Sequence, residues 1–417
     1  MKIIDVQAAV SLAASEAVAA KTAGTFGVGG VLLDQQGRVL KSLHNNVVKG
    51  GLVFDPTAHG ERQLIDWYFA ERARGTALPA PHELTLVTTL DPCAMCAGAI
   101  LAAGFSVVVA AEDPRAGVDH DVSASFGALP LGLREPARRA FCYPGVRGTS
   151  SYAREARGAA PPSFFIGKTI AEACQALCSL ALEATSDKVQ QLLQNDLPRE
   201  ALRDIATLPA DHPIVRKLRS LYPQALSWRG NPHAPGAGLA PFLLEAMEQD
   251  RRQGGEGDAA ALLDAFGNLL LVTPGRRDQS AILTPFMECT RQYAQLRYML
   301  LQGLDEAARA ELLPYLAHPK HGTFVLALGP SQEAASFMDL GAWGSTMEGP
   351  LPLENPGQFQ FVVPRMGEGE LAELCARMPP LYSGVIGIAP RQVADAGLIT
   401  ALQKAGTGAE RQSPGRH

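Results

Sequence analysis

The sequence lacks the roughly 20 consecutive apolar residues that a membrane-spanning helix needs, so we expect no transmembrane segment. In the first residues Asp5 and Glu16 interrupt the apolar side chains, so we expect an amphipathic helix there and not a signal peptide. Cysteine is scarce: seven in 417 residues, an odd number that argues against a disulfide scaffold and favours reduced thiols in the cytoplasm.

A surplus of basic charge is also missing. The net charge is −5, and residues 1–160 hold 15 Lys and Arg against 15 Asp and Glu. Nucleic-acid-binding proteins usually carry a basic face, so this balance favours a small-molecule substrate.

The length of the chain exceeds what a single hydrophobic core usually supports, which predicts several domains. The N-terminal part alternates the two periodicities that are typical of helices and strands. Its expected order is a helix (6–20), two strands joined by a turn (25–45), a helix (57–75), a strand (83–90), a helix (93–104) and a strand (105–112). This order predicts a three-layer α/β/α domain, which we place at residues 1–155.

A helical connector is expected over residues 156–230, with breaks at Pro198 and Pro213. Cys174 and Cys178 lie four residues apart on one face of its first helix. That spacing could suit a metal, but no histidine or further cysteine lies nearby. We therefore expect them to be small buried hydrophobic side chains.

Residues 231–417 follow the same order of elements as the first part, after the Pro- and Gly-rich break "GNPHAPGAG". The segment "AALLDAFGNLLLVTPG" resembles "VGGVLLDQQGRVLKS", and "GTFVLALGPSQEAASFMDLGA" resembles "LTLVTTLDPCAMCAGAILAAG". We infer a degenerate second deaminase-like α/β domain that forms an internal pseudo-dimer with the first. The alternative is that any α/β domain repeats strands and helices in this order. A homodimer of whole chains is a further open possibility.

The inferred second copy has lost every chemically important position of the first. Matching the Arg-Gln pairs of the two parts sets Glu288 against His59 and Thr290 against Glu61. Matching Pro330 with Pro92 sets two further residues, Ser331 and Ala334, against the two cysteines of the first part. We therefore predict that the second copy binds no zinc.

Two short motifs carry the chemistry, "HGE" at residues 59–61 and "PCAMC" at 92–96. One imidazole (His59) and two thiolates (Cys93 and Cys96) suit Zn²⁺, and three protein ligands leave the fourth position open, as in catalytic sites. Zinc lowers the pKa of a bound water, and Glu61, beside the metal but not a ligand, can carry the proton. A histidine and two thiols buried in a core are the alternative. The combined H-x-E and P-C-x-x-C pattern resembles the signature of zinc deaminases.

Residues 26–121 resemble the guanine deaminases and tRNA adenosine deaminases of the cytidine-deaminase-like superfamily. The resemblance rests on "TFG", "HNNVVKGGLVFDPTAHGE" and "DPCAMCAGA". It implies that His59, Cys93 and Cys96 bind zinc and that Glu61 shuttles protons. It also implies that Asn46 hydrogen-bonds the heterocycle, with the neighbouring Asn45 as the other candidate.

Several residues depart from the family pattern or are open to two interpretations. Gly60 replaces the usual alanine between the histidine and the glutamate, which leaves room beside the substrate ring and loosens the helix start. Two interpretations of Phe26 stay open: it lines the base pocket, or it belongs to the hydrophobic core. The same holds for Asp119 and Asp121: one of them contacts the substrate, or both are solvated loop residues. Asp91 replaces the usual glutamate before Pro-Cys, and the connector and third part replace the C-terminal tail of the family.

The predicted function is that of a zinc-dependent hydrolytic deaminase of a free nucleobase, nucleoside or related heterocycle, with a guanine-like purine as first candidate. In this hypothesis hydroxide formed on Zn²⁺ attacks the amine-bearing carbon, and Glu61 carries the proton to the ring and then to the departing ammonia. Deamination of cytosine-type pyrimidines and of adenosine in tRNA are the enzymatic alternatives. A zinc-stabilised scaffold protein is the alternative without catalysis, although such a site has no use for Glu61.

Overall fold

The computed structural model describes residues 1–347, 349, 351–352 and 357–410. Its first sheet has six strands in the order β2-β1-β5-β6-β7-β9. The strand bounds are β1 Gly29–Leu33, β2 Val39–His44, β5 Thr85–Leu90, β6 Ser106–Ala111, β7 Phe141–Tyr143 and β9 Arg157–Gly158. Strands β5, β6 and β7 run parallel, whereas β1 is antiparallel to both of its neighbours. The helices that follow β1–β2 and β5 therefore begin at one edge of this sheet.

Helices cover both faces of the first sheet. Helices α1 (Val6–Ala23) and α5 (Glu172–Gln194) pack against one face, and α2 (Gly60–Ala73), α3 (Ala94–Ala103) and α4 (Leu131–Ala140) cover the other. Strands β1 and β5 are consequently buried along their whole length. The predicted three-layer α/β domain is confirmed.

The connector begins by adding to the first sheet. Strand β9 pairs with β7, β10 (Thr169–Ala171) pairs with β8 (Gly145–Arg147), and α5 packs against α1. Cys178 is fully buried in that packing, and Cys174 lies beside the hydroxyl of Ser11. Helix α6 (Pro213–Leu221) and short 3-10 turns then lead into the second half of the chain.

A second sheet of five strands repeats the first in order and in register. Its order β12-β11-β13-β14-β15 corresponds to β2-β1-β5-β6-β7, with the same parallel and antiparallel pairs. The strand bounds are β11 Ala259–Leu263, β12 Leu269–Pro274, β13 Thr323–Leu328, β14 Phe359–Val363 and β15 Arg391–Gln392. Each hairpin also contains an irregularity at the same place, between Leu32 and Leu33 and between Leu262 and Leu263.

The turns of the two hairpins share their hydrogen bonds as well. Asp34 accepts from the backbone N–H groups two and four residues ahead, and Asp264 does the same. The following glycines, Gly37 and Gly267, both have a left-handed backbone that favours glycine. Agreement in strand order, register, irregularity and turn supports two copies of one fold.

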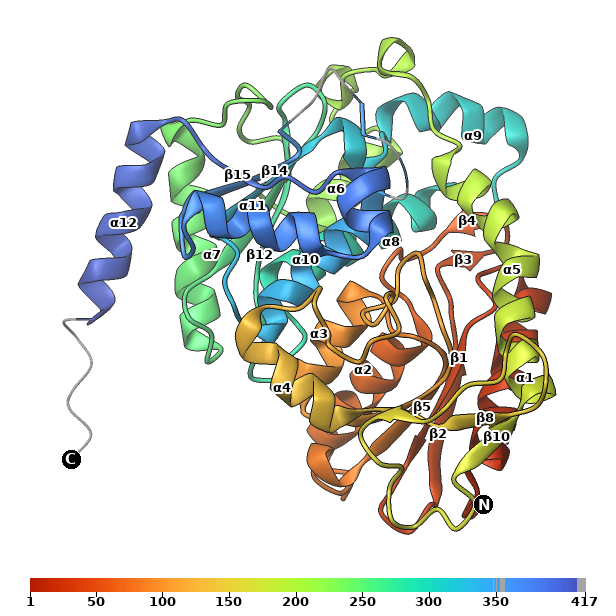
Figure 1. Cartoon of the computed structure of the whole chain (residues 1–417). Helices are drawn as coiled ribbons and strands as arrows, with labels where there is room; N and C mark the ends of the chain where they lie inside the picture. Colours follow the sequence, from red (N-terminus) through yellow and green to blue (C-terminus); the bar gives the residue numbers. More distant parts are fainter. Residues whose placement is uncertain (348, 350, 353–356, 411–417) are drawn as a thin grey trace.

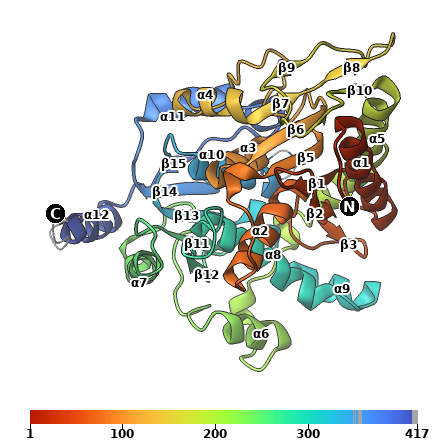
Figure 2. The same cartoon turned by 90° about the horizontal axis from the view of Figure 1, so that it is seen from below.

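The two copies join through a shared layer of helices between the sheets. Helices α2 and α3 of the first copy meet α8 (Pro285–Leu301) and α10 (Ala334–Met347) of the second in one hydrophobic core. Helices α1 and α5 cover the outer face of the first sheet, and α7 (Ala240–Arg252) and α12 (Ala396–Glu410) that of the second (Figures 1 and 2). None of the described helices is long and apolar enough to cross a membrane.

Helices α3 and α10 approach each other so closely that their backbones touch. A Cβ atom added to Gly98 would lie 2.5 Å from the backbone nitrogen of Met338. One added to Gly341 would lie 2.1 Å from the backbone nitrogen of Met95. Neither position has room for a side chain, because the atoms in the way are backbone atoms.

We predict that Gly341→Ala destabilises the protein by about 1–3 kcal/mol, because the helices must separate to admit the methyl group. The matched control is Gly369→Ala in α11 (Glu368–Arg377), where an added Cβ meets nothing within 4 Å. The control should be neutral or stabilising by up to about 1 kcal/mol. Urea unfolding measures both, and equal stability of the two variants would contradict the close contact.

A buried histidine introduces a dependence of stability on pH. His318 is 7% exposed, and its Nδ1 accepts a hydrogen bond from the backbone N–H of Lys320. Burial, with a smaller contribution from Arg297, lowers the pKa of His318 to about 3. The folded protein therefore keeps this ring neutral where the unfolded chain would protonate it.

We predict that His318 makes the free energy of unfolding fall as the pH drops below about 6.5, by about 1.4 kcal/mol per pH unit. Between pH 6.5 and about 3 the unfolded state binds a proton on His318 that the folded state does not bind, so lowering the pH favours unfolding. His318→Asn retains an acceptor for Lys320 but does not titrate. Its unfolding free energy, measured in urea between pH 6.5 and 4.5, should fall less steeply than that of the wild type. Parallel curves would contradict this role.

Candidate metal centre

His59 lies where the turn "DPT" meets α2, as the residue that caps the N-terminus of the helix. The turn is held by Asp55, whose Oδ1 accepts hydrogen bonds from the backbone N–H (2.8 Å) and hydroxyl (2.6 Å) of Thr57. The carbonyl of Thr57 then accepts from the N–H of His59 at 2.8 Å. The backbone that presents the imidazole is therefore fixed by the buried carboxylate of Asp55, four residues before His59.

The two thiols lie at the start of the next helix. Cys93 caps the N-terminus of α3 directly after β5, and Cys96 lies in the first helical turn. Neither forms a disulfide, and both are buried. Because i and i+3 positions lie on one face of a helix, the two sulfurs point in one direction. A helix N-terminus also favours the thiolate form.

The three side chains meet at distances that fit a metal ion. Nδ1 of His59 lies 3.5 Å from Sγ of Cys93 and 3.6 Å from Sγ of Cys96, and all three donor atoms lie within 4.8 Å of one another. A tetrahedral zinc ion with ordinary bond lengths places nitrogen and sulfur ligands about 3.5–3.6 Å apart. One imidazole and two thiols are also the donor types that zinc prefers. The residues present therefore fit zinc.

Hydrogen bonding within the site prepares one thiol for ionisation. The hydrogen bond from Cys96, assisted by His59, places the pKa of the Cys93 thiol well below its usual range despite burial. Because a metal binds the thiolate and not the thiol, this arrangement suits a ligand.

Glu61 lies in the first turn of α2, beside the donors but outside their set. Its Oε1 accepts a hydrogen bond from the hydroxyl of Thr88 at 3.0 Å, and its Oε2 accepts from the Cys96 thiol at 3.5 Å. Burial, followed by the neighbouring Cys93, raises the pKa of Glu61. A carboxyl group with a raised pKa can take up and return a proton near neutral pH.

Two of the three donors, His59 and Cys93, line a cavity of about 180 Å³ together with Glu61. Its walls come from three regions of the chain. The first domain contributes Phe26, Val28, Asn45, His59, Glu61, Leu90, Asp91, Cys93, Asp113, Arg115 and Ala116; helix α5 contributes Leu182, Ser186 and Gln190; and the second copy contributes Ser345, Leu381 and Tyr382.

Of the substrate residues expected from the sequence, some line the cavity and others do not. Phe26 lines the cavity, and so does Asn45, whose Oδ1 accepts from Thr25 and from the backbone of Val47. Asn46 and Gly60 are not among the lining residues. A Cβ on Gly60 would lie 3.6 Å from the carbonyl oxygen of Leu43 in β2 and 3.7 Å from the backbone nitrogen of Gly30 in β1, so the absent methyl group would pack against these strands.

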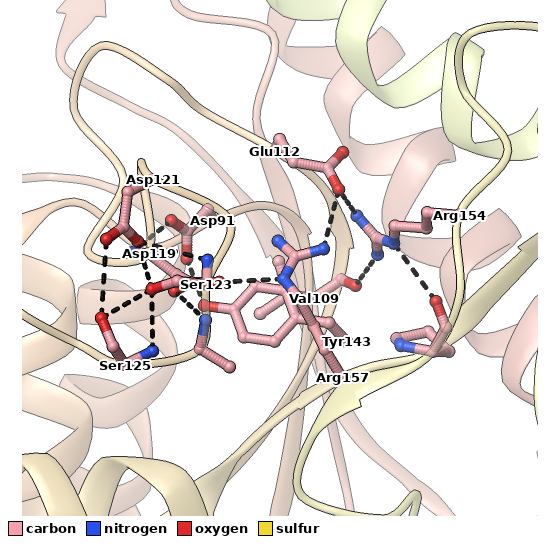
Figure 3. Close-up of polar contacts among 12 residues, drawn as sticks. Asp91, Val109, Glu112, Asp119, Asp121, Ser123, Ser125, Tyr143, Arg154 and Arg157 are labelled. Carbon is pink, nitrogen blue, oxygen red and sulfur yellow. Dashed lines mark hydrogen bonds and ion pairs between the residues drawn. The ribbon is translucent and has the colours of Figure 1, made fainter.

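Asp119 is buried and is not among the residues that line the cavity; it belongs to the polar network of Figure 3. Its carboxylate accepts from Nε of Arg157 at 2.9 Å and from the backbone N–H of Ala124, while its own N–H donates to Asp91. Asp121 is exposed and bonds Ser123. These contacts give Asp119 a role in holding the loop after β6.

Sequence reasoning missed the walls that come from outside the first domain. Nothing in the local sequence marks Gln190 or Tyr382, because their position depends on how α5 and the second copy pack. A backbone hydrogen bond from Leu381 to the carbonyl of Arg115 ties these walls to the loop after β6. The resemblance covers only the first domain and could not reveal them.

The equivalent place in the second copy has different chemistry. Thr284 caps the N-terminus of α8 as His59 caps α2, so the alignment of Glu288 with His59 is wrong by about one helical turn. The physical reason is that α8 begins earlier, at Pro285, whose carbonyl accepts from Thr273 of β12. The Thr284 hydroxyl donates to Asp339 at 2.6 Å. Within the described residues, the second copy contains no group of three metal donors.

Comparison with known proteins agrees with this geometry. Residues 4–112 match the family model of the cytidine and deoxycytidylate deaminase zinc-binding region. The chain is 36% identical over 97 residues to a tRNA(Ile)-lysidine synthase of Deinococcus radiodurans, which covers 23% of this chain and 16% of that protein. A tRNA(Ile)-lysidine synthase of Thermus thermophilus is 36% identical over 136 residues, or 33% and 23% of the two chains. The match thus spans about a sixth to a quarter of the length of these relatives.

Solved structures with partial similarity come from two kinds of deaminase. A chain from a study of A-to-I editing by tRNA:A34 deaminases is 32% identical, covers 27% of this chain and 81% of its own, and has a TM-score of 0.22. The guanine deaminase from Nitrosomonas europaea is 18% identical, with coverage of 45% and 87% and a TM-score of 0.28. On the family match and the donor geometry, residues 4–112 are a zinc-binding region of the cytidine-deaminase-like superfamily.

Proposed function

We propose that this chain is a zinc-dependent hydrolytic deaminase of a small aminated heterocycle. The observation that carries the proposal is the position of Glu61. It is a buried carboxyl group that shares one cavity with His59 and Cys93 without belonging to the donor set. A site that serves only to stabilise a fold gains nothing from a proton acceptor at this place.

Zinc, when bound by His59, Cys93 and Cys96, would supply Lewis-acid activation of water near neutral pH. Glu61 takes one proton from the attacking water as the water oxygen adds to the amine-bearing carbon, and gives that proton to the ring nitrogen. Glu61 then carries the proton of the added hydroxyl to the amine, so that the carbon–nitrogen bond breaks, ammonia leaves and the ring keeps a carbonyl group. The hydroxyl of Thr88 holds one carboxylate oxygen, which directs the other toward the metal donors.

A small flat substrate fits the walls of the cavity. Phe26 offers an aromatic face, and the amide nitrogen of Asn45 donates no hydrogen bond to a described residue, which leaves it for an acceptor on a ring. Gln190 also lines the cavity, and its side chain makes no hydrogen bond within the described part of the chain. Pockets of this kind combine apolar walls with a few polar groups that orient the ligand. Asn45 therefore replaces Asn46 as the proposed contact, and a guanine-like purine is the first substrate to test.

Adenosine in tRNA is the second candidate, because the curated relatives are named for tRNA. Against it stand the balanced charge of residues 1–160 and the walls that α5 and the second copy add around the cavity. Cytosine-type pyrimidines stay as a further alternative among small substrates.

We predict that Cys93→Ser lowers bound zinc well below one per chain, whereas Glu61→Gln keeps zinc and loses about 10²–10⁴-fold of the deaminase rate. The reason is that Cys93 is a donor and Glu61 only moves protons. Zinc is measured by atomic absorption and ammonia by a coupled assay. Cys174→Ser, a half-buried thiol outside the site, is the matched control and should change neither quantity.

The substrate is tested by ammonia release from purine and pyrimidine bases, their nucleosides and a tRNA transcript. The proposal expects activity on a free base or nucleoside, with guanine first, and salt-insensitive rates. Deamination confined to the transcript would favour the second candidate. Zinc at one per chain with no ammonia from any compound would overturn the enzymatic proposal.

A further inference from the structure

Arg291 belongs to α8 of the second copy, yet its guanidinium reaches carboxylates of the first copy. Its Nε lies 3.7 Å from Oδ2 of Asp55, and its Nη2 lies 3.6 Å from Oδ2 of Asp66. The third nitrogen, Nη1, lies 3.4 Å from Glu288 on its own helix. Arg291 thus bridges the two copies beside the turn that leads to His59.

Arg291 adds a second guanidinium beside two carboxylates that share one guanidinium within the first copy. Asp55 and Arg62 have side chains only 2% exposed and form an ion pair of 3.0 Å, while Asp66 also bonds Arg62. Two carboxylates then share one guanidinium of their own domain. Burial alone would raise the pKa of Asp55, but Arg62, Arg291 and Thr57 together hold that pKa below its usual range. A buried carboxylate without sufficient partners is strongly unfavourable.

Asp55 is connected to His59 through hydrogen bonds of Thr57. It holds both the N–H and the hydroxyl of Thr57, and the carbonyl of Thr57 accepts from the N–H of His59. Nε of Arg62 bonds the same carbonyl. The carboxylate of Asp55 has to stay in one orientation to hold the turn before His59. One of its oxygens accepts from Thr57, and the other faces Arg62 and Arg291.

Helix α8 touches the same segment at a second point. The ring of Tyr298 meets that of Phe54 edge to face, with centroids 5.1 Å apart. Phe54 directly precedes Asp55, so two successive residues of the turn rest on the second copy.

We propose that Arg291 is a positioning residue for the metal centre, which fixes the turn that presents His59 through Asp55 and Thr57. The second copy then has a defined task, because it completes the support of a metal ligand in the first. This inference rests on the proposed zinc function, but it concerns how the ligand is held and not which substrate is used.

The test uses the full-length zinc-loaded protein and two arginine variants of α8. Arg291→Met removes the charge and should release zinc to a chromogenic chelator about 10–100-fold faster, as is typical when the partner of a metal ligand is lost. It should also shift the visible absorption of the Co²⁺-substituted protein, because the imidazole is less fixed. Arg297→Met is the matched control, since Arg297 bonds only the carbonyl of Leu316 among the described hydrogen bonds. Its zinc release should stay within about threefold of the wild type.

Zinc release and cobalt spectra of Arg291→Met equal to those of the wild type, or equal changes in both variants, would overturn the proposal. If Arg291→Met does not fold, Arg291→Lys decides, because it keeps the charge but cannot contact three carboxylates at once. A several-fold faster release from Arg291→Lys at an unchanged melting temperature supports the role, and wild-type release from it contradicts the role. These readouts need no substrate, so a failure of the deaminase proposal would not be mistaken for a failure of this one.

Discussion

The backbone contact between α3 and α10 is the constraint on which the rest of the structure depends. Gly98 and Gly341 allow the two helices to touch, and α3 carries both Cys93 and Cys96. The helix that holds two metal donors is therefore part of the interface between the copies. A shift of α10 relative to the first sheet would move the sulfurs, since a packed core does not deform gradually.

The metal centre draws on both copies in three ways. Helix α10 packs against the cysteine helix, Arg291 and Tyr298 of α8 rest on the turn before His59, and Tyr382 closes part of the cavity. A second copy without donors of its own can thus still be needed for the chemistry of the first. This arrangement explains why a chain of 417 residues surrounds a metal-binding region of about a hundred.

The sequence predicted what depends on local spacing. The spacing of His59 and Glu61, and of Cys93 and Cys96, identified side chains that meet because helix starts place them on one edge of the sheet. The order of elements and the resemblance of "AALLDAFGNLLLVTPG" to "VGGVLLDQQGRVLKS" also predicted the second copy, and the strand register and turns agree with this prediction.

The sequence could not predict what depends on packing between distant segments. Gln190 and Tyr382 enter the cavity only because α5 and the second copy fold over it. Asp119 and Asp121 were substrate candidates by their place after β6; the ion pair of Asp119 with Arg157 could not be predicted, because Arg157 comes from a strand that no motif marks. The misplacement of Glu288 has a similar origin, because matching Arg-Gln pairs took no account of an earlier helix start at Pro285.

The central claim is that this chain holds zinc through three protein ligands with one position left open. Zinc K-edge X-ray absorption on the purified full-length protein tests it most directly. The account predicts one imidazole nitrogen, two sulfurs and one further light, exchangeable ligand. A shell of four protein ligands, or a shell without two sulfurs, would contradict it.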